Sequence, residues 1–63
     1  MRLDEVKEGC FRVIKCKSER LMKIGLIKGK KITVLLNRRY LVVLIDNAKF
    51  VIDKKLARSI EVD

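Results

Sequence analysis

Two apolar stretches in the middle of the chain have the composition of β-strands. Residues 31–36 and 41–46 are rich in β-branched and aliphatic side chains, and the polar segment Asn37-Arg38-Arg39-Tyr40 joins them. We predict a hairpin whose register matches aliphatic residues on one face, because a slip of one residue would exchange the faces. One face pairs Leu36 with Leu41, Val34 with Val43 and Ile32 with Ile45, and the other pairs Leu35 with Val42, Thr33 with Leu44 and Lys31 with Asp46.

A second hairpin is predicted directly after the first. Its connection is Asp46-Asn47-Ala48-Lys49, in which the asparagine tolerates the left-handed conformation of a turn. In that register Ile45 faces Phe50, Val43 faces Ile52, and Asp46 opposes Lys49 with the opposite charge. The aliphatic face of the two hairpins forms the predicted core, which consists of Ile32, Val34, Leu36, Leu41, Val43, Ile45, Phe50 and Ile52.

Shorter elements flank the hairpins. Leu3 and Val6 are apolar at helical or turn spacing and Gly9 ends that opening segment, while residues 10–16 have the composition of a strand. A short helix begins after the N-cap Ser18 and runs to about Ile24. Near the end of the chain, Asp53 caps one helical turn over residues 54–58, with Leu56 and Ala57 inward, before a last strand at 59–62.

These elements predict a mostly β fold in one domain over residues 1–63. We expect a small β-barrel of about five strands, with a short helix between the first two strands and a helical turn before the last. Closure of the barrel would protect the strand edges.

The outer face of the two hairpins is also apolar. It carries Leu35, Val42, Leu44 and Val51, with Tyr40 at the tip. A monomer of 63 residues rarely leaves so much apolar surface exposed. Either the opening segment or the helix covers this face, or it is an interface with a second copy of the chain or another partner.

The charge of the chain is strongly positive and unevenly distributed. Sixteen Lys and Arg residues against eight Asp and Glu residues give a net charge of +8. Seven of the basic residues and no acidic one fall between positions 20 and 45: Arg20, Lys23, Lys28, Lys30, Lys31, Arg38 and Arg39. Such a face favours phosphate, an anionic membrane surface or an acidic protein, unless it serves only to keep a small barrel soluble.

Targeting signals are not visible in the chain. The charged start, Met-Arg-Leu-Asp-Glu-Val-Lys-Glu, contains no apolar region of a signal peptide, and the longest apolar run is residues 41–45. We therefore expect a cytoplasmic protein that does not insert into the membrane.

The chain offers little catalytic or metal-binding chemistry. It has no histidine, no glycine-rich phosphate loop, and its acidic residues fall at predicted turns, caps and termini. Cys10 and Cys16 lie on one predicted strand, on the same face but about 20 Å apart, which is too far for a disulfide or a shared metal ion. We expect two separate, buried or half-buried thiols, no metal, no cofactor and no enzymatic activity.

Taken in order, three sets of residues resemble the FeoA family, the small ferrous iron transport protein A. The opening pattern Leu-x-x-Val/Leu-x-x-Gly is met by Leu3, Val6 and Gly9. The pattern Arg-x-Leu-x-x-Leu-Gly-Leu-x-x-Gly is met by Arg20, Leu21, Ile24, Gly25, Leu26 and Gly29, and a late Leu-x-x-x-x-Ala-x-x-Ile-x-Val pattern by Ile52, Ala57, Ile60 and Val62. The resemblance implies an SH3-like barrel that binds or regulates ferrous iron transport protein B, with the cytoplasmic GTPase domain of that transporter as its partner.

The resemblance also suggests where a partner would bind. Gly25 and Gly29 would shape the corner between the helix and the next strand. The partner-binding surface would then consist of Arg20 and Lys23 on the helix and of Ile27, Lys28 and Lys30 at the corner. Two departures from the family are Lys28, where a proline is usual, and the short tip at 37–40, which replaces a longer loop carrying Gly-Asp-Pro.

An alternative function is nucleic-acid binding by a small basic barrel. Such barrels stack bases on aromatic side chains beside basic residues. Tyr40, next to Arg38 and Arg39, is the one cluster of this kind outside the predicted core.

Overall fold

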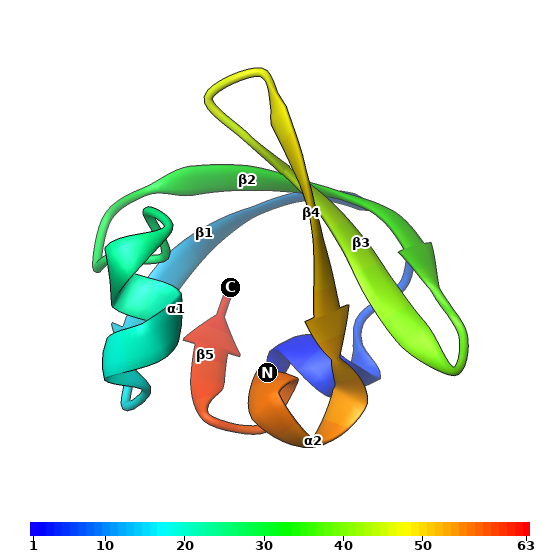
Figure 1. Ribbon diagram of the computed structural model, residues 1–63, viewed down its shortest axis with the longest axis horizontal. Coiled ribbons are helices and arrows are strands. Elements are labelled where there is room, and N and C mark those ends of the chain that lie inside the picture. Colours follow the sequence, from blue (N-terminus) through cyan, green and yellow to red (C-terminus); the bar gives the residue numbers. More distant parts are fainter.

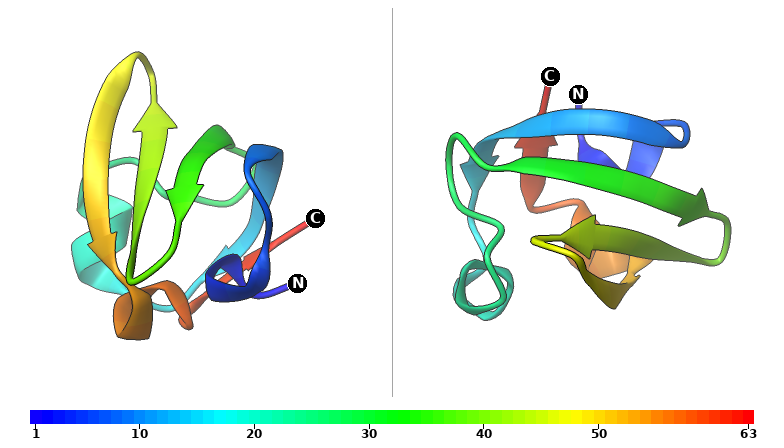
Figure 2. Two further views of the ribbon diagram at one scale, coloured as in Figure 1. Left: turned by 90° about the vertical axis from the view of Figure 1, so that its right-hand side faces the viewer. Right: turned by 90° about the horizontal axis from the view of Figure 1, so that it is seen from above.

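The structure is a computed structural model that describes residues 1–63, and its framework is one antiparallel sheet (Figure 1). The five strands are β1 (Gly9–Cys16), β2 (Lys31–Asn37), β3 (Tyr40–Ile45), β4 (Ala48–Asp53) and β5 (Ile60–Val62). They are arranged in the order β4-β3-β2-β1-β5. The sheet curls around a central core, as the two views of Figure 2 show, so the predicted five-stranded, mostly β fold is confirmed.

Short helices join or close the strands at the predicted places. The 3-10 helix η1 (Leu3–Glu5) precedes β1, α1 (Glu19–Lys23) links β1 to β2, and α2 (Lys54–Ala57) precedes β5. Both predicted caps are present, because the Ser18 Oγ accepts from the Leu21 N–H and the Asp53 carboxylate accepts from the Lys55 N–H. None of the helices has the length and apolar character required to span a bilayer.

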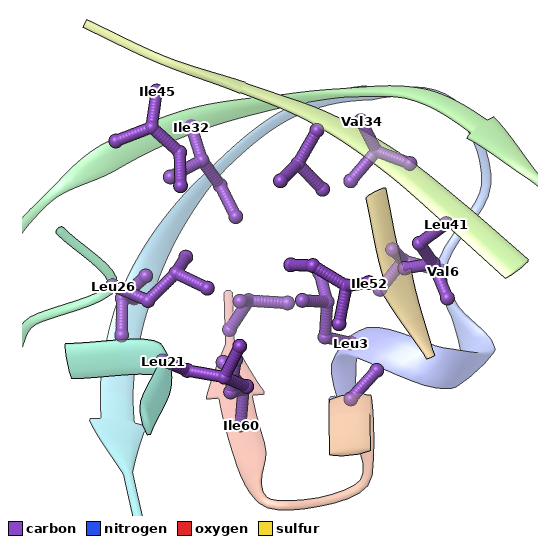
Figure 3. Packing of buried hydrophobic residues seen from close by; sticks show 14 residues of the cluster. Leu3, Val6, Leu21, Leu26, Ile32, Val34, Leu41, Ile45, Ile52 and Ile60 are labelled. Carbon is purple, nitrogen blue, oxygen red and sulfur yellow. The ribbon is translucent and has the colours of Figure 1, made fainter. Parts of the chain in front are cut away.

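The core draws on every part of the chain. Side chains from the sheet, from α1 and from η1 point toward one another in its centre (Figure 3). Six of the eight predicted core residues are fully buried, whereas Leu36 and Phe50 are only half-buried. The buried apolar set is Leu3, Val6, Val13, Leu21, Leu26, Ile32, Val34, Leu41, Val43, Ile45, Ile52, Ala57, Ile60 and Val62.

A bulge in β2 explains why Leu36 is not in the core. The predicted pairs Val34–Val43 and Thr33–Leu44 are present, but the register shifts between Val34 and Leu36. Beyond the shift Leu36 pairs with Val42 and Asn37 pairs with Leu41, so the predicted Leu36–Leu41 and Leu35–Val42 pairs are wrong. The extra residue turns Leu36 to the outer face and brings Asn37 to the inner one.

The second hairpin turns more tightly than predicted. Only Asp46 and Asn47 form the turn, with φ angles of 50° and 68°, and Ile45 pairs directly with Ala48. Two consecutive left-handed residues fit the twist of a two-residue hairpin. The register therefore differs by two residues from the predicted one, which corrects the Ile45–Phe50, Val43–Ile52 and Asp46–Lys49 pairs. An even shift keeps each side chain on its face, so Ile52 is buried as predicted.

A second bulge, in β1, places the cysteines on different faces. The register of β1 with β5 shifts between Val13 and Lys15. Cys10 is exposed, whereas Cys16 is half-buried against the core. The prediction that both thiols share a face and are at least half-buried is therefore wrong, since the bulge reverses the alternation along β1.

Asn37 joins three elements at the end of β2. Its Nδ2 donates to the carbonyl oxygens of Asp4 (3.2 Å) and Val6 (2.6 Å), and its Oδ1 accepts from the Lys54 Nζ at 2.6 Å. These bonds connect β2 to the opening segment and to α2. The side chain thereby satisfies carbonyl groups that no strand or helix pairs.

We expect Asn37→Ala to lower the free energy of unfolding by about 2 kcal/mol, because two carbonyl oxygens and one ammonium group lose a partner together. Urea denaturation measures this change. The exposed neighbouring residue provides a matched control, and Arg38→Ala is expected to change the stability by less than about 0.5 kcal/mol. Equal losses for the two variants would contradict the role assigned to Asn37.

Candidate partner-binding surface

The C-terminal end of α1 sets the direction of the corner that follows. The Gly25 N–H donates to the Met22 carbonyl and the Leu26 N–H donates to the Leu21 carbonyl, both at 3.1 Å. This pair of bonds is the Schellman motif, in which the residue after the helix takes a left-handed conformation. Gly25 has a φ of 110°, and Leu26 is buried against the core together with Leu21.

Two hydrogen bonds then hold the corner against β1. The Gly29 N–H donates to the Val13 carbonyl at 2.7 Å, and the Val13 N–H donates to the Lys30 carbonyl at 2.9 Å. Gly29 has a φ of 90°, so the turn at residues 28–29 also depends on glycine. Because both ends of the corner are fixed, Ile27 and Lys28 project into solvent, and Ile27 remains 50% exposed.

Ile27 and Lys28 lie in a shallow groove between α1, the corner and β1. Two further apolar side chains line it and are also exposed, Ile14 at 44% and Met22 at 38%. Lys15 and the half-buried Cys16 complete the lining. We call this surface, formed by Ile14, Lys15, Cys16, Met22, Ile27 and Lys28, the corner groove.

The corner groove combines apolar side chains with positive charge. Neither Lys15 nor Lys28 takes part in an ion pair within the chain. Exposed apolar side chains beside polar ones are typical of a protein-recognition surface. The groove is therefore suited to an apolar side chain from a partner whose surrounding surface is acidic.

The structure separates the other predicted partner-binding residues. Arg20 and Lys23 are exposed on α1, but Arg20 lines a different groove, which runs between α1, β4 and α2. The ammonium of Lys30 is 2.6 Å from the Asp46 carboxylate and connects the corner to the turn of the second hairpin. Lys30 thus forms an ion pair within the chain, whereas Lys28 forms none and the Ile27 side chain is exposed.

The candidate nucleic-acid cluster lies at the opposite end of β2 from the corner (Figure 1). Arg38 and Arg39 form the tip of the first hairpin, and all three side chains of the cluster are exposed, Tyr40 to 46%. The structure therefore divides the basic residues into two regions, one at each end of β2.

The outer face of the hairpins stays open in the isolated chain. Leu35, Tyr40 and Val51 are exposed to 39%, 46% and 70%, and Val42 and Leu44 are half-buried. Leu36 joins this face through the bulge. Of the two explanations offered by the sequence, coverage by the opening segment or the helix does not hold for the three exposed side chains.

Metal-binding side chains do not gather anywhere in the chain. No three Cys, Asp or Glu side chains are close enough together to share an ion. The Cys16 thiol donates to the Ser18 carbonyl oxygen at 3.4 Å, and the Cys10 sulfur lies 3.6 Å from the Thr33 hydroxyl.

A curled five-stranded sheet with a short helix after its first strand defines a class of small SH3-like domains. Comparison with known proteins shows which family of that class is present. The model of the FeoA domain family matches residues 1–63, so the chain belongs to the FeoA family, which is associated with ferrous iron transport.

A solved structure supports the same assignment. The NMR structure of an FeoA protein from Chlorobium tepidum superposes with a TM-score of 0.82 at 26% sequence identity. The match covers 98% of this chain and 68% of that one. The comparison with curated proteins finds no match.

The two glycines of the corner should differ in their tolerance of alanine. A Cβ atom at Gly25 would lie 3.1 Å from the Ile45 Cγ2, whereas a Cβ atom at Gly29 would meet nothing within 4 Å. Both substitutions strain a left-handed backbone, but only the first also crowds the core. We expect losses of about 2 to 3 kcal/mol for Gly25→Ala and about 1 to 2 kcal/mol for Gly29→Ala.

Urea denaturation of the two variants measures the difference. A Gly25→Ala variant as stable as Gly29→Ala would contradict the close packing of the corner against Ile45.

Proposed function

We propose that this chain is a non-enzymatic accessory protein of ferrous iron uptake that binds the cytoplasmic GTPase domain of ferrous iron transport protein B. Membership of the FeoA family supports the link to iron transport. The observation that carries the binding proposal is the corner groove, where Ile14, Met22 and Ile27 remain exposed beside the free ammonium groups of Lys15 and Lys28.

The rigidity of the groove favours binding to a folded partner. Its side chains come from β1, from α1 and from a corner fixed by hydrogen bonds at both ends. Little backbone freedom is lost when such a surface binds, so more of the contact energy contributes to affinity. The lysines speed association with an acidic partner and make the rate sensitive to salt.

The ferrous ion is the cargo of the transporter in this proposal. The chain contacts the protein that handles the ion and supplies no ligand to it. This role places the chain in the cytoplasm, next to the membrane-embedded transporter.

Two substitutions in the corner groove should weaken binding to the GTPase domain without unfolding the chain. Ile27→Ala removes the most exposed apolar side chain of the groove and should raise Kd by about tenfold, the usual size of a contact near the centre of an interface. Lys28→Glu reverses a charge at the rim and should raise Kd by a similar factor at low salt, but less at high salt. Calorimetric titration measures both.

Arg39→Glu is the matched control, because it reverses an exposed positive charge at the other end of β2. It should leave the affinity for the GTPase domain unchanged. The competing function, binding of single-stranded nucleic acid by Arg38, Arg39 and Tyr40, predicts the reverse. In that case an oligonucleotide binds at low salt, Arg39→Glu weakens it, and Ile27→Ala does not.

A further inference from the structure

The two edge strands of the sheet, β5 and β4, differ in whether their outer side is hydrogen-bonded within the chain. β5 is covered on its outer side, because Arg2 bridges to Glu61, and Met1 exchanges two hydrogen bonds of 2.7 Å with Val62. β4 forms the other edge, and Figure 2 shows no strand beyond it. One edge is therefore paired within the chain and the other is free.

The free edge of β4 presents unpaired backbone groups. Ile45 and Ala48 close the two-residue turn, so the hydrogen-bonded pairs of β3 and β4 alternate from there through Phe50 and Ile52. The N–H and C=O groups of Lys49 and Val51 consequently point away from β3. No backbone hydrogen bond outside the ladders involves either residue.

β4 lacks two of the features that often protect an edge strand. Its six residues pair with β3 without a bulge, and it contains no proline. Val51, at the middle of the outward row, is 70% exposed, the most exposed of the large apolar side chains. A regular edge without a bulge or a proline can serve as a template for another strand.

The charges on this edge identify the strand that fits it. Lys49 and Asp53 are both exposed, and neither forms an ion pair in the chain. They lie about 13 Å apart along β4, too far to pair with each other. If a second β4 runs antiparallel with its Val51 opposite this Val51, however, each Lys49 faces the Asp53 of the other copy.

That register also satisfies the backbone. Residues 49, 51 and 53 all lie in the outward-facing row, so they meet the corresponding row of a second copy in hydrogen-bonded pairs. On the inner side the half-buried Phe50 would face Ile52 of the second copy. The strand is thus complementary to itself in charge, in apolar character and in hydrogen bonding.

We propose that two copies of this chain associate by antiparallel pairing of their β4 strands about a two-fold axis at Val51. The pairing joins the two five-stranded sheets into one and makes their apolar outer faces continuous. The corner groove shares no lining residue with the groove that borders β4 and contains no residue of β4, so its residues take no part in the proposed pairing.

Sedimentation equilibrium of the whole chain over about 10 to 500 µM tests the pairing, using charge variants of β4. The wild type should show a monomer–dimer equilibrium. In Lys49→Asp two like-charged pairs replace two attractive ones, so the dissociation constant should rise roughly tenfold. Asp53→Lys should have the same effect, and an equimolar mixture of the two variants should dimerise again, since every pair in the mixed dimer is opposite in charge.

Further measurements guard against effects on folding. Asp53 also caps α2, so thermal melts of each variant must show a folded chain. Val51→Pro removes the central outward N–H without breaking the bonds to β3, and it should also abolish dimerisation. Lys17→Asp, which reverses an exposed unpaired charge away from β4, is the matched control and should dimerise like the wild type.

Hydrogen exchange provides a second readout. The Lys49 and Val51 amides should become protected as the protein concentration rises, whereas Phe50 and Ile52 should be protected at every concentration. A wild type that stays monomeric to 500 µM would overturn the proposal. A dimer that is unaffected by Lys49→Asp and Val51→Pro would also overturn the proposal. Such a result would indicate that the two copies associate through the outer face of the hairpins.

Discussion

The left-handed backbone at Gly25 is the constraint on which the rest of the structure depends. It ends α1 with two hydrogen bonds to Leu21 and Met22 and turns the chain back toward the sheet. The turn buries Leu26 beside Leu21, and the next residue, Ile27, faces outward. A side chain at Gly25 would press on Ile45 in β3, so the corner and the sheet require each other. Ile27 is exposed in the corner groove because the residue directly before it, Leu26, is fixed in the core.

Hydrogen bonds of a polar side chain, Asn37, hold the other end of β2. Asn37 reaches the core side only because the bulge at Leu35 shifts the register, and there it bonds to the opening segment and α2. β2 is thus fixed at one end by a glycine corner and at the other by an amide. Between these points the curved sheet needs no long loop, which suits a chain of 63 residues.

The features that the sequence predicted well are those set by local chemistry. Helix caps at Ser18 and Asp53, the glycine corner, the left-handed Asn47 and the two hairpins of β2, β3 and β4 all follow from residues close together in the chain. The bulges in β1 and β2 could not be predicted, because they arise from the curvature of the whole sheet. They moved Leu36 outward and separated the faces of Cys10 and Cys16.

The candidate site also combines residues that follow from the local sequence with residues that only the fold brings together. Ile27 and Lys28, which the sequence predicts to share a surface, both line the corner groove, because they are adjacent and lie within three residues of the corner glycines. Ile14 and Met22 were missed, since only the folded chain brings β1 and α1 to that groove. Arg20 was assigned to the same surface, but the helix directs it to the β4 side. Membership of the FeoA family was the conclusion that the ordered pattern of residues supported best.

Amide chemical-shift mapping of the labelled chain, titrated with the cytoplasmic GTPase domain of ferrous iron transport protein B, tests the central claim most directly. Saturable shifts concentrated at Ile14, Lys15, Met22, Ile27 and Lys28 are the result that the corner groove predicts. Saturable shifts concentrated at Arg38–Tyr40 or along β4, or no shifts with a folded and active partner domain, would contradict it.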